Sequence, residues 1–226
     1  MSIIPDTKKR DFTNTLRITE IFYSLQGETR TIGLPTVFVR LTGCPLRCGY
    51  CDTEYAFFGG KIQTIDNIIN TIAKYKAKYI TVTGGEPLAQ KGCIKLLEKL
   101  CDLDYRVSLE TSGALDISNV DKRVVTILDL KTPGSKMSNK NLYTNLDYLD
   151  QNKDQIKFVL CDYQDYLWAK EIISKYNLIN KAEVLLSPSF GEVDLKDLAK
   201  WILEDNLQVR MQLQLHKYIW GDEKGR

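Results

Sequence analysis

The sequence predicts an α/β fold, an incomplete parallel barrel of about six strand–helix units with short extensions at its N- and C-terminal ends. Segments with strand-like and helix-like patterns alternate from Ile18 onward, as is typical of parallel strands joined by crossover helices. Of the 226 residues 43% are hydrophobic, which suffices for a sizeable core, whereas a complete eight-unit barrel usually needs about 250 residues. We therefore expect a single domain over residues 18–226, preceded by a polar, loosely ordered segment at 1–17.

Residue type and spacing predict each element in turn. Strands are expected where β-branched and aromatic residues run between turn residues, at 35–41, 79–83, 106–110, 124–130, 155–160, 182–186 and 209–215. Residues 64–73 carry apolar side chains at the spacing of one helix face, with Thr64 as the N-cap. Further helices are expected around 94–100, 165–176 and 195–205. The shortened barrel leaves an open end, which we expect the segment around Gln26 to cover.

Composition excludes several classes of function. The chain has 31 basic and 29 acidic residues, so it shows no bulk signature of a nucleic-acid or membrane-surface protein. Its single histidine, His216, excludes sites that need two imidazoles. No apolar run approaches the roughly 20 residues that span a bilayer, and residues 1–10 contain no signal-like apolar segment. We therefore expect a cytoplasmic protein with reduced thiols, and its six cysteines need an explanation other than disulfides.

Three of the six cysteines lie within eight residues, in the segment Cys44-Pro-Leu-Arg-Cys48-Gly-Tyr-Cys51. The proline and glycine favour a loop, so a chance cluster of core cysteines is the less favoured interpretation. A structural zinc ion would need a fourth ligand, and the candidates form no paired motif: Cys93, Cys101, Cys161 and His216. An iron–sulfur cluster accepts three thiolates and leaves one iron open as a substrate site.

This C-x3-C-x2-C loop, with Tyr50 before its last cysteine, resembles the signature of radical S-adenosylmethionine (SAM) enzymes. The resemblance implies a radical-SAM-type barrel and a [4Fe-4S] cluster on Cys44, Cys48 and Cys51, with SAM chelating the open iron. The segment Thr83-Gly-Gly-Glu-Pro87, after a predicted strand, resembles the glycine-glycine-glutamate motif of that family. Glycines let the backbone approach a ligand closely, and a glutamate can accept from a cationic amino group.

From about Ile18 to Trp220 the chain resembles one subgroup, the 7-carboxy-7-deazaguanine synthases. The matching segments are 21–28, 38–40, 51–53, 110–113, 129–131 and 214–217, with Ser112 standing where asparagine is expected. The resemblance implies conversion of 6-carboxy-5,6,7,8-tetrahydropterin to 7-carboxy-7-deazaguanine with loss of ammonia, assisted by Mg²⁺ and with SAM regenerated, in 7-deazapurine (queuosine- or archaeosine-type) biosynthesis. It also implies a reducing partner of flavodoxin or ferredoxin type and a homodimer.

The same resemblance assigns site residues. The substrate-binding set is Leu25, Gln26, Gly27, Arg40, Thr111 and His216. The SAM-binding set is Tyr50, Asp52, Gly84, Gly85, Glu86, Gly113, Asp129, Lys131 and Ser135, and Thr53 is expected to help hold Mg²⁺. Taken alone, Gln26 can also be a solvated loop residue, Arg40 a rim ion pair and Asp52 a loop cap. For His216, a hydrogen-bonded wall of the substrate pocket is favoured over acid–base work.

Two other functions remain open at this point. A glycyl-radical-activating enzyme would share the cysteine loop and the glycine-glycine-glutamate motif, but its protein substrate would require an open groove. The triplet Leu25-Gln-Gly27 favours a small flat substrate instead. The third interpretation is a non-catalytic binding module stabilised by zinc.

Overall fold

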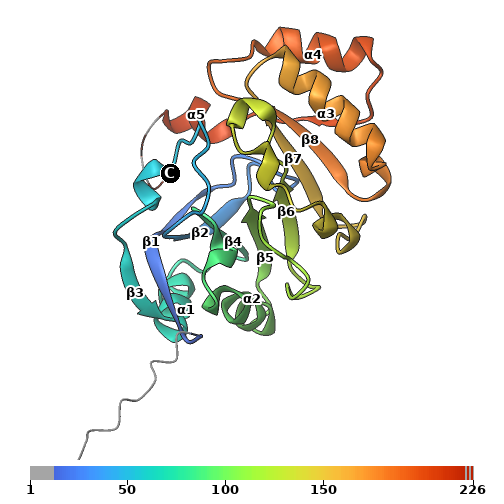
Figure 1. Ribbon diagram of the computed structural model, residues 1–226. Helices are drawn as coiled ribbons and strands as arrows, with labels where there is room; N and C mark the ends of the chain where they lie inside the picture. The colour runs from blue at the N-terminus through green and yellow to red at the C-terminus, as the bar shows by residue number, and fades with distance from the viewer. Residues whose placement is uncertain (1–12, 222, 224, 226) are drawn as a thin grey trace, which may run out of the picture.

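The structure is a computed structural model, and it describes residues 13–221, 223 and 225. Its centre is a curved sheet with the strand order β3-β1-β2-β4-β5-β6-β7-β8-β9 (Figure 1). All neighbouring pairs from β2 to β9 are parallel, whereas β1 pairs antiparallel with β2 and β3. The strands are Thr15–Leu25, Pro35–Leu41, Lys61–Thr64, Tyr79–Gly84, Arg106–Thr111, Val125–Asp129, Gln155–Leu160, Glu183–Pro188 and Arg210–Met211 for β1 to β9.

The helices are α1 to α5, with the bounds Ile65–Ala73, Gly92–Asp102, Tyr163–Lys175, Leu195–Glu204 and Leu215–Trp220. The partial α/β barrel is confirmed, but only four of its connections hold a crossover helix, because β5–β6 and β6–β7 are joined by turns and short 3-10 segments. In the β5–β6 connection, short polar turns stand in place of a helix. Asp116 accepts from the backbone N of Ser118 at 2.9 Å, and Asp121 accepts from that of Arg123 at 2.8 Å. Such local bonds compete with helix formation.

The ends of the domain differ from the sequence-based expectations. Residues 1–12 of the segment expected to be loosely ordered lie outside the described residues, but the expectation was wrong for Thr15–Arg17, which begin β1. Leu16 packs in the core with 1% of its surface exposed. The strand β3 was not predicted, because its four residues are mostly exposed and carry no apolar pattern. The strand expected at 209–215 is only Arg210–Met211, since Leu215 begins α5 and its backbone N donates to the Gly27 carbonyl at 2.9 Å.

The strands divide their residues between two sides of the sheet. Alternate apolar residues such as Val37, Val39 and Leu41 of β2 point outward and are fully buried under α1 and α2. A second apolar cluster joins β6 to β8 with α3 and α4. The positions in between point into the barrel, and many are polar, for example Thr81 of β4 and Glu110 of β5. The barrel interior is therefore lined by groups that can bind a polar ligand.

The open side of the barrel is closed without strand pairing. Within the described residues, β3 and β9 form the two edges of the sheet. The β1–β2 loop, residues 26–34, reaches the first residues of β7 and β8: Arg30 donates through its backbone N to Gln155 at 3.0 Å and through Nε to Glu183 at 3.2 Å. The bond between Leu215 and Gly27 joins α5 to the same loop. This loop contains Gln26 and lies at the amino ends of β2, β7 and β8, whereas the cysteine loop follows the carboxyl end of β2.

Thr64 is confirmed as an N-cap, since its Oγ accepts from the backbone N of Asn67 at 3.2 Å. Replacing Thr64 with alanine is expected to lower the free energy of unfolding by about 1 kcal/mol. Thr71 lies in the same helix, and its hydroxyl donates to the Asn67 carbonyl at 2.9 Å. Thr71→Ala is the matched control and should change stability by less than about 0.5 kcal/mol, because alanine has the higher helix propensity. Chemical denaturation of both variants measures the difference, and equal losses would contradict the capping role.

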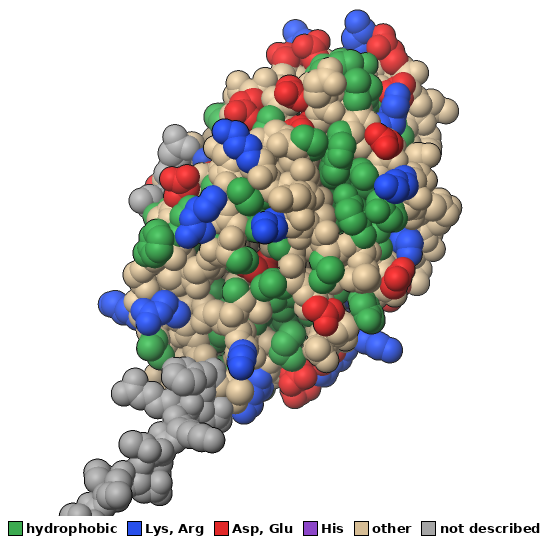
Figure 2. All heavy atoms as spheres, viewed as in Figure 1, with side chains coloured by type: hydrophobic (Ala, Val, Ile, Leu, Met, Phe, Trp, Pro, Cys, Tyr) green, Lys and Arg blue, Asp and Glu red, His purple; other side chains and the backbone are tan. Residues whose placement is uncertain are grey.

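Charged side chains of both signs are spread over the face of the molecule seen in Figure 2, rather than gathered in one large patch. Across the described ranges, no helix combines the length and apolarity required to cross a membrane.

Candidate active site

A cavity of about 430 Å³ lies inside the barrel, at the carboxyl ends of the parallel strands. Most of the predicted site residues line it, although they come from all parts of the chain. These are Leu25, Gln26, Gly27, Arg40, Cys44, Cys48, Tyr50, Cys51, Asp52, Thr53, Gly84, Gly85, Thr111, Asp129, Lys131 and His216. Glu86, Gly113 and Ser135 are not among the residues that line it.

The cysteine loop follows β2 and presents three free thiols to the cavity, those of Cys44, Cys48 and Cys51. The backbone N of Leu46 donates to the Cys44 sulfur at 3.4 Å, a bond that favours the thiolate needed by a metal. Burial raises the pKa of all three thiols. The loop is fixed from outside, because Gly49 donates to the Ser135 carbonyl at 3.1 Å.

The donor set fits an iron–sulfur cluster. In the part of the chain that the structure describes, no three His, Cys, Asp or Glu side chains converge as ligands of one metal ion. A [4Fe-4S] cluster binds its cysteines at separate irons, so three thiols on one loop suit it. The remaining cysteines lie elsewhere: Cys93 and Cys101 are buried in α2, whereas Cys161 is partly exposed.

The turn after β4 needs its two glycines because it packs against the backbone that begins the cysteine loop. A Cβ on Gly84 would lie 2.6 Å from the Leu41 backbone N, at a φ of +150°. A Cβ on Gly85 would lie 2.5 Å from the Gly43 carbonyl carbon. No side chain fits between these two segments, so the backbone of the turn borders the cavity beside Cys44.

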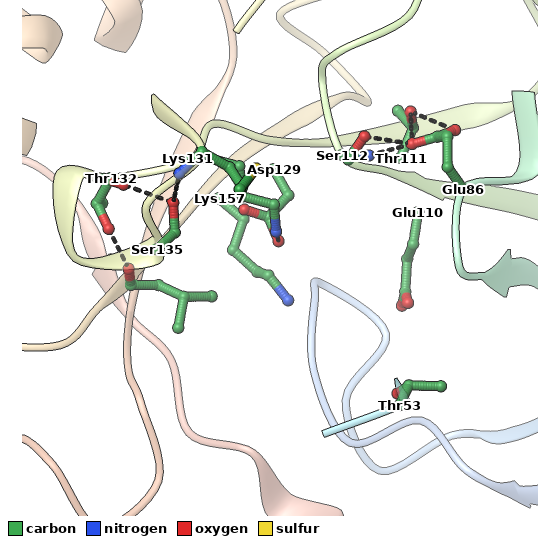
Figure 3. A network of polar contacts seen from close by, with 12 residues as sticks. Thr53, Glu86, Glu110, Thr111, Ser112, Asp129, Lys131, Thr132, Ser135 and Lys157 are labelled. Carbon is green, nitrogen blue, oxygen red and sulfur yellow. Dashed lines mark hydrogen bonds and ion pairs between the residues drawn. The ribbon is translucent and has the colours of Figure 1, made fainter. Parts of the chain in front are cut away.

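Glu86 has a different position from the one expected. Its side chain is fully buried, and its carboxylate accepts from Leu88 N at 2.9 Å, Thr111 Oγ at 3.0 Å and Ser112 N at 2.7 Å. The Ser112 hydroxyl adds a further bond at 2.5 Å (Figure 3). The structure corrects the prediction in this respect: the carboxylate joins the loops after β4 and β5, and only the backbone of this turn faces the cavity. The Thr111 hydroxyl is committed to the same carboxylate.

An ion pair lies beside the cysteine loop. Lys131 Nζ is 2.8 Å from Asp129 Oδ2, and the ammonium lies 5.6 Å from the centre of the Tyr50 ring. Burial alone would lower the pKa of Lys131, but Asp129 and its other neighbours raise it well above its usual value, so the group stays charged. Within the described residues, Asp129 Oδ1 and the Tyr50 hydroxyl are buried without hydrogen-bond partners. Two unpartnered polar atoms next to the three thiols fit a polar ligand such as SAM.

Gly113 and Ser135 shape the loops behind this wall instead of lining it. The Gly113 carbonyl accepts from Leu142 N at 2.9 Å, and a φ of +72° favours glycine there. Ser135 is buried, and its hydroxyl donates to the Thr132 carbonyl at 2.6 Å. Neither residue lines the cavity, so the structure gives no support for their predicted contact with SAM.

The predicted substrate triplet forms the opposite wall. Gln26 is buried, with 2% of its surface exposed, so it is not a solvated loop residue. Its Nε2 donates to Thr81 Oγ at 3.1 Å, and its Oε1 accepts from Glu28 N at 3.2 Å. A Cβ on Gly27 would run into the His216 ring. Burial lowers the pKa of His216, which favours a neutral imidazole in the cavity wall.

Arg40 and the pair Asp52–Thr53 border the cavity between these walls. Arg40 Nε is 2.7 Å from Glu20 Oε1, so the ion pair considered from the sequence exists while the side chain also lines the cavity. Thr53 Oγ donates to Asp52 Oδ1 at 2.7 Å. Desolvation opposes the ionisation of Asp52, but the Thr53 hydroxyl and the nearby Lys217 hold its pKa below the usual value.

Sequence reasoning missed five charged residues that line the cavity, and these are Glu28, Glu110, Lys157, Glu192 and Lys217. Lys157 Nζ is 2.6 Å from Glu28 Oε2. Burial alone would lower the pKa of Lys157, but Glu28 and other nearby acidic groups raise it above its usual value. The available signal was a single charged residue inside an apolar strand, such as Lys157 between Ile156 and Phe158. In a buried parallel strand such a residue must point into the barrel or be paired.

Comparisons with known proteins agree with this geometry. The model of the radical SAM superfamily matches residues 38–202. A 7-carboxy-7-deazaguanine synthase of Chlorobaculum tepidum is 45% identical over 210 residues, covering 92% of this chain and 96% of the relative. One of Koribacter versatilis is 42% identical, covering 92% and 98%. The crystal structure of QueE from Escherichia coli superposes with a TM-score of 0.75 at 20% identity, covering 89% of this chain and 95% of that one, which supports the fold.

Membership follows from the length of these matches. The superfamily model spans more than half of the chain, and relatives above 40% identity are covered almost end to end. A [4Fe-4S] cluster and SAM are the cofactors of this superfamily, in line with the three free thiols of the cysteine loop. The chain therefore belongs to the radical SAM superfamily and, within it, to the family of the 7-carboxy-7-deazaguanine synthases.

Proposed function

We propose that this protein converts 6-carboxy-5,6,7,8-tetrahydropterin to 7-carboxy-7-deazaguanine with loss of ammonia, in 7-deazapurine biosynthesis. The supporting observation is that one cavity is lined by both the cysteine loop and the triplet 25–27. A cavity of about 430 Å³ suits a small flat molecule next to a cofactor better than a protein segment. A glycyl-radical-activating enzyme and a zinc-stabilised module are therefore not favoured.

The chain's own residues divide the work between the two walls. When bound, the cluster supplies the electron that generates a carbon radical from SAM. Cys44, Cys48 and Cys51 are proposed to hold three irons, and the Asp129–Lys131 pair to border SAM. On the other wall, Gln26 is held rigidly by its bonds to Thr81 and Glu28, so it can orient a substrate without rearranging.

The Asp52–Thr53 pair supports a proposed Mg²⁺ site. The lowered pKa of Asp52 keeps its carboxylate ionised, and Mg²⁺ prefers carboxylate, hydroxyl and water oxygens. The Thr53 hydroxyl donates its hydrogen to Asp52, so its oxygen lone pairs would be available to the ion. A reducing partner of flavodoxin or ferredoxin type, a cytoplasmic location and a homodimer stay predictions from the family resemblance.

Anaerobic turnover tests the proposed function. Reconstituted, reduced protein is incubated with SAM, Mg²⁺ and 6-carboxy-5,6,7,8-tetrahydropterin, and the product is identified by mass spectrometry. We expect 7-carboxy-7-deazaguanine in many-fold excess over enzyme, and a brown protein with about four irons per chain. An intact four-iron cluster without product would refute the proposed reaction. A colourless protein with one zinc ion would instead support the binding module.

A further inference from the structure

Asp165 is a buried carboxylate behind the wall of the cavity that holds the Asp129–Lys131 pair. It lies in the first turn of α3, has 1% of its surface exposed and is not among the residues that line the cavity. A buried charge is costly unless hydrogen bonds satisfy it, although the N-terminal end of a helix favours a negative charge. The donors around Asp165 therefore show which segments this carboxylate joins.

Three donors from two connections of the fold meet at the carboxylate. Asp165 Oδ2 accepts from Thr132 Oγ at 2.8 Å and from the backbone N of Cys161 at 3.0 Å. Asp165 Oδ1 accepts from the backbone N of Gly134 at 2.8 Å. Hydrogen bonds to an ionised carboxylate are about twice as strong as those between neutral groups. Asp165 thus fastens the loop of residues 132–135, which follows β6, to the end of β7 and the start of α3.

The loop of residues 132–135 is packed closely against this joint. A Cβ on Gly134 would run into the Asp165 carboxylate and would lie 3.0 Å from the Cys161 sulfur. Only a glycine backbone can approach the carboxylate this closely. The loop is also closed internally, because the Ser135 hydroxyl donates to the Thr132 carbonyl at 2.6 Å (Figure 3). The position of Asp165 therefore fixes the position of the whole loop.

The same loop supports the cysteine loop from outside the cavity. The Ser135 carbonyl accepts from the backbone N of Gly49 at 3.1 Å, and Gly49 directly follows the second cysteine of the cysteine loop. A path of hydrogen bonds therefore runs from Asp165 through residues 132–135 to the middle of the cysteine loop. Lys131, which lines the cavity, directly precedes residues 132–135 and is fixed by the same joint.

We propose that Asp165 is a positioning residue of the radical SAM centre. By fixing residues 132–135, it holds the cysteine loop and Lys131 in the arrangement that binds the cluster and SAM. Asp165 does not line the cavity, so it acts only through these two segments. Groups that orient the ligands of a metal typically contribute about 10- to 100-fold to affinity or activity.

Asp165→Asn tests the proposal, because asparagine keeps the size of the side chain. In either orientation of the amide, its NH2 group faces a backbone N–H, that of Cys161 or that of Gly134, so the joint loses a bond. Peptide hydrogen exchange of the reconstituted protein without SAM measures the mobility of residues 44–51, and anaerobic equilibrium dialysis measures SAM affinity. We expect faster exchange in 44–51 and SAM binding weaker by about 10- to 100-fold, with about four irons retained.

Asp154→Asn is the matched control. Asp154 is also a buried carboxylate, with 2% of its surface exposed, and its two oxygens accept from the backbone N of Thr126 at 2.7 Å and that of Asp150 at 2.8 Å. It directly precedes β7, whereas Asp165 lies beyond the other end of that strand. Asp154→Asn should lower the melting temperature about as much as Asp165→Asn, but exchange in 44–51 and SAM affinity should stay native.

Thr132→Val is a milder variant that removes only the hydroxyl donor of the joint. It should show the same two changes at smaller size, and it decides the question if Asp165→Asn does not fold. Turnover adds a measurement that rests on the proposed function. In Asp165→Asn the KM for 6-carboxy-5,6,7,8-tetrahydropterin should stay within about threefold of the native value, because the triplet 25–27 lies on the opposite wall.

The outcomes separate this role from general stability and from the proposed function. Native exchange in 44–51 and native SAM affinity in Asp165→Asn would overturn the positioning role. Equal changes in Asp154→Asn would overturn it as well, because they would reflect a general loss of stability. A native protein that binds SAM at an intact cluster but forms no product would refute the proposed reaction, while exchange and SAM affinity would still decide the role of Asp165.

Discussion

Replacing Cys48 with alanine is expected to abolish turnover, with activity falling by about a thousandfold or more. The sulfur of Cys48 lines the cavity from the middle of a loop whose ends are fixed by neighbouring backbone bonds, so no other cysteine can take its place. Even changes that only disturb the surroundings of a metal ligand cost about 10- to 100-fold, and removal of a ligand costs more. Iron analysis, visible absorption and product formation under anaerobic conditions measure the effect.

Cys101→Ala is the matched control for that loss. Cys101 is also a buried free thiol, but it lies in α2 and does not border the cavity. This variant should keep about four irons and most of its activity while losing a little stability from the small void. If Cys48→Ala retained both its cluster and its turnover, the assignment of the cluster to this loop would be wrong.

Replacing Glu86 with alanine is expected to cause the largest loss of stability among single substitutions in the site, about 3–5 kcal/mol. The carboxylate is fully buried and satisfies donors from Leu88, Thr111 and Ser112. Each buried donor left without a partner costs roughly 1–3 kcal/mol, and rotation of the two hydroxyls recovers part of this. The apparent melting temperature of the reconstituted protein should fall by about 10 °C.

Two further variants locate the cause of that loss. Glu98→Ala removes an exposed glutamate and should leave the melting temperature within about 1 °C of the native value. Glu86→Gln keeps an oxygen acceptor but replaces the other oxygen with a donor, so it should be intermediate. Native-like stability of Glu86→Ala would show that the carboxylate is not the joint between the two loops.

The parts of the fold that follow from sequence are those governed by local periodicity. The helix at 64–73 and its cap depend on spacing within ten residues, and both are confirmed. The absence of a crossover helix between β5 and β6 depends on a competition between helix formation and the side-chain turns at Asp116 and Asp121. The strand predicted at 209–215 was too long for another reason. Its alternating pattern continues to Leu215, but the backbone N of Leu215 bonds to the distant Gly27 carbonyl instead of to a strand.

In the candidate site, too, local motifs could be predicted from the sequence and long-range contacts could not. The cysteine loop could be predicted because its ligands are close in sequence, and the structure places all three thiols in one cavity. Glu86 and Ser135 were placed wrongly because a motif gives no information on where a side chain points. Glu110 and Lys157 come from strands 47 residues apart in sequence, and only the parallel register brings them to one space.

The closure of the barrel by the β1–β2 loop has a consequence for motion. The contacts of Arg30 and Gly27 across the gap are a few side-chain and single backbone bonds, whereas the paired strands on either side share continuous ladders. Local opening therefore costs less around the exposed Arg30 and in α5 than within the sheet, and amide hydrogens there should exchange faster than those of β4 and β5. Residues 26–28 of the same loop are buried, and Glu28 is tied to β7 by its ion pair with Lys157. Exchange of the amides around Arg30 and in α5 can occur while every strand of the sheet keeps its neighbours.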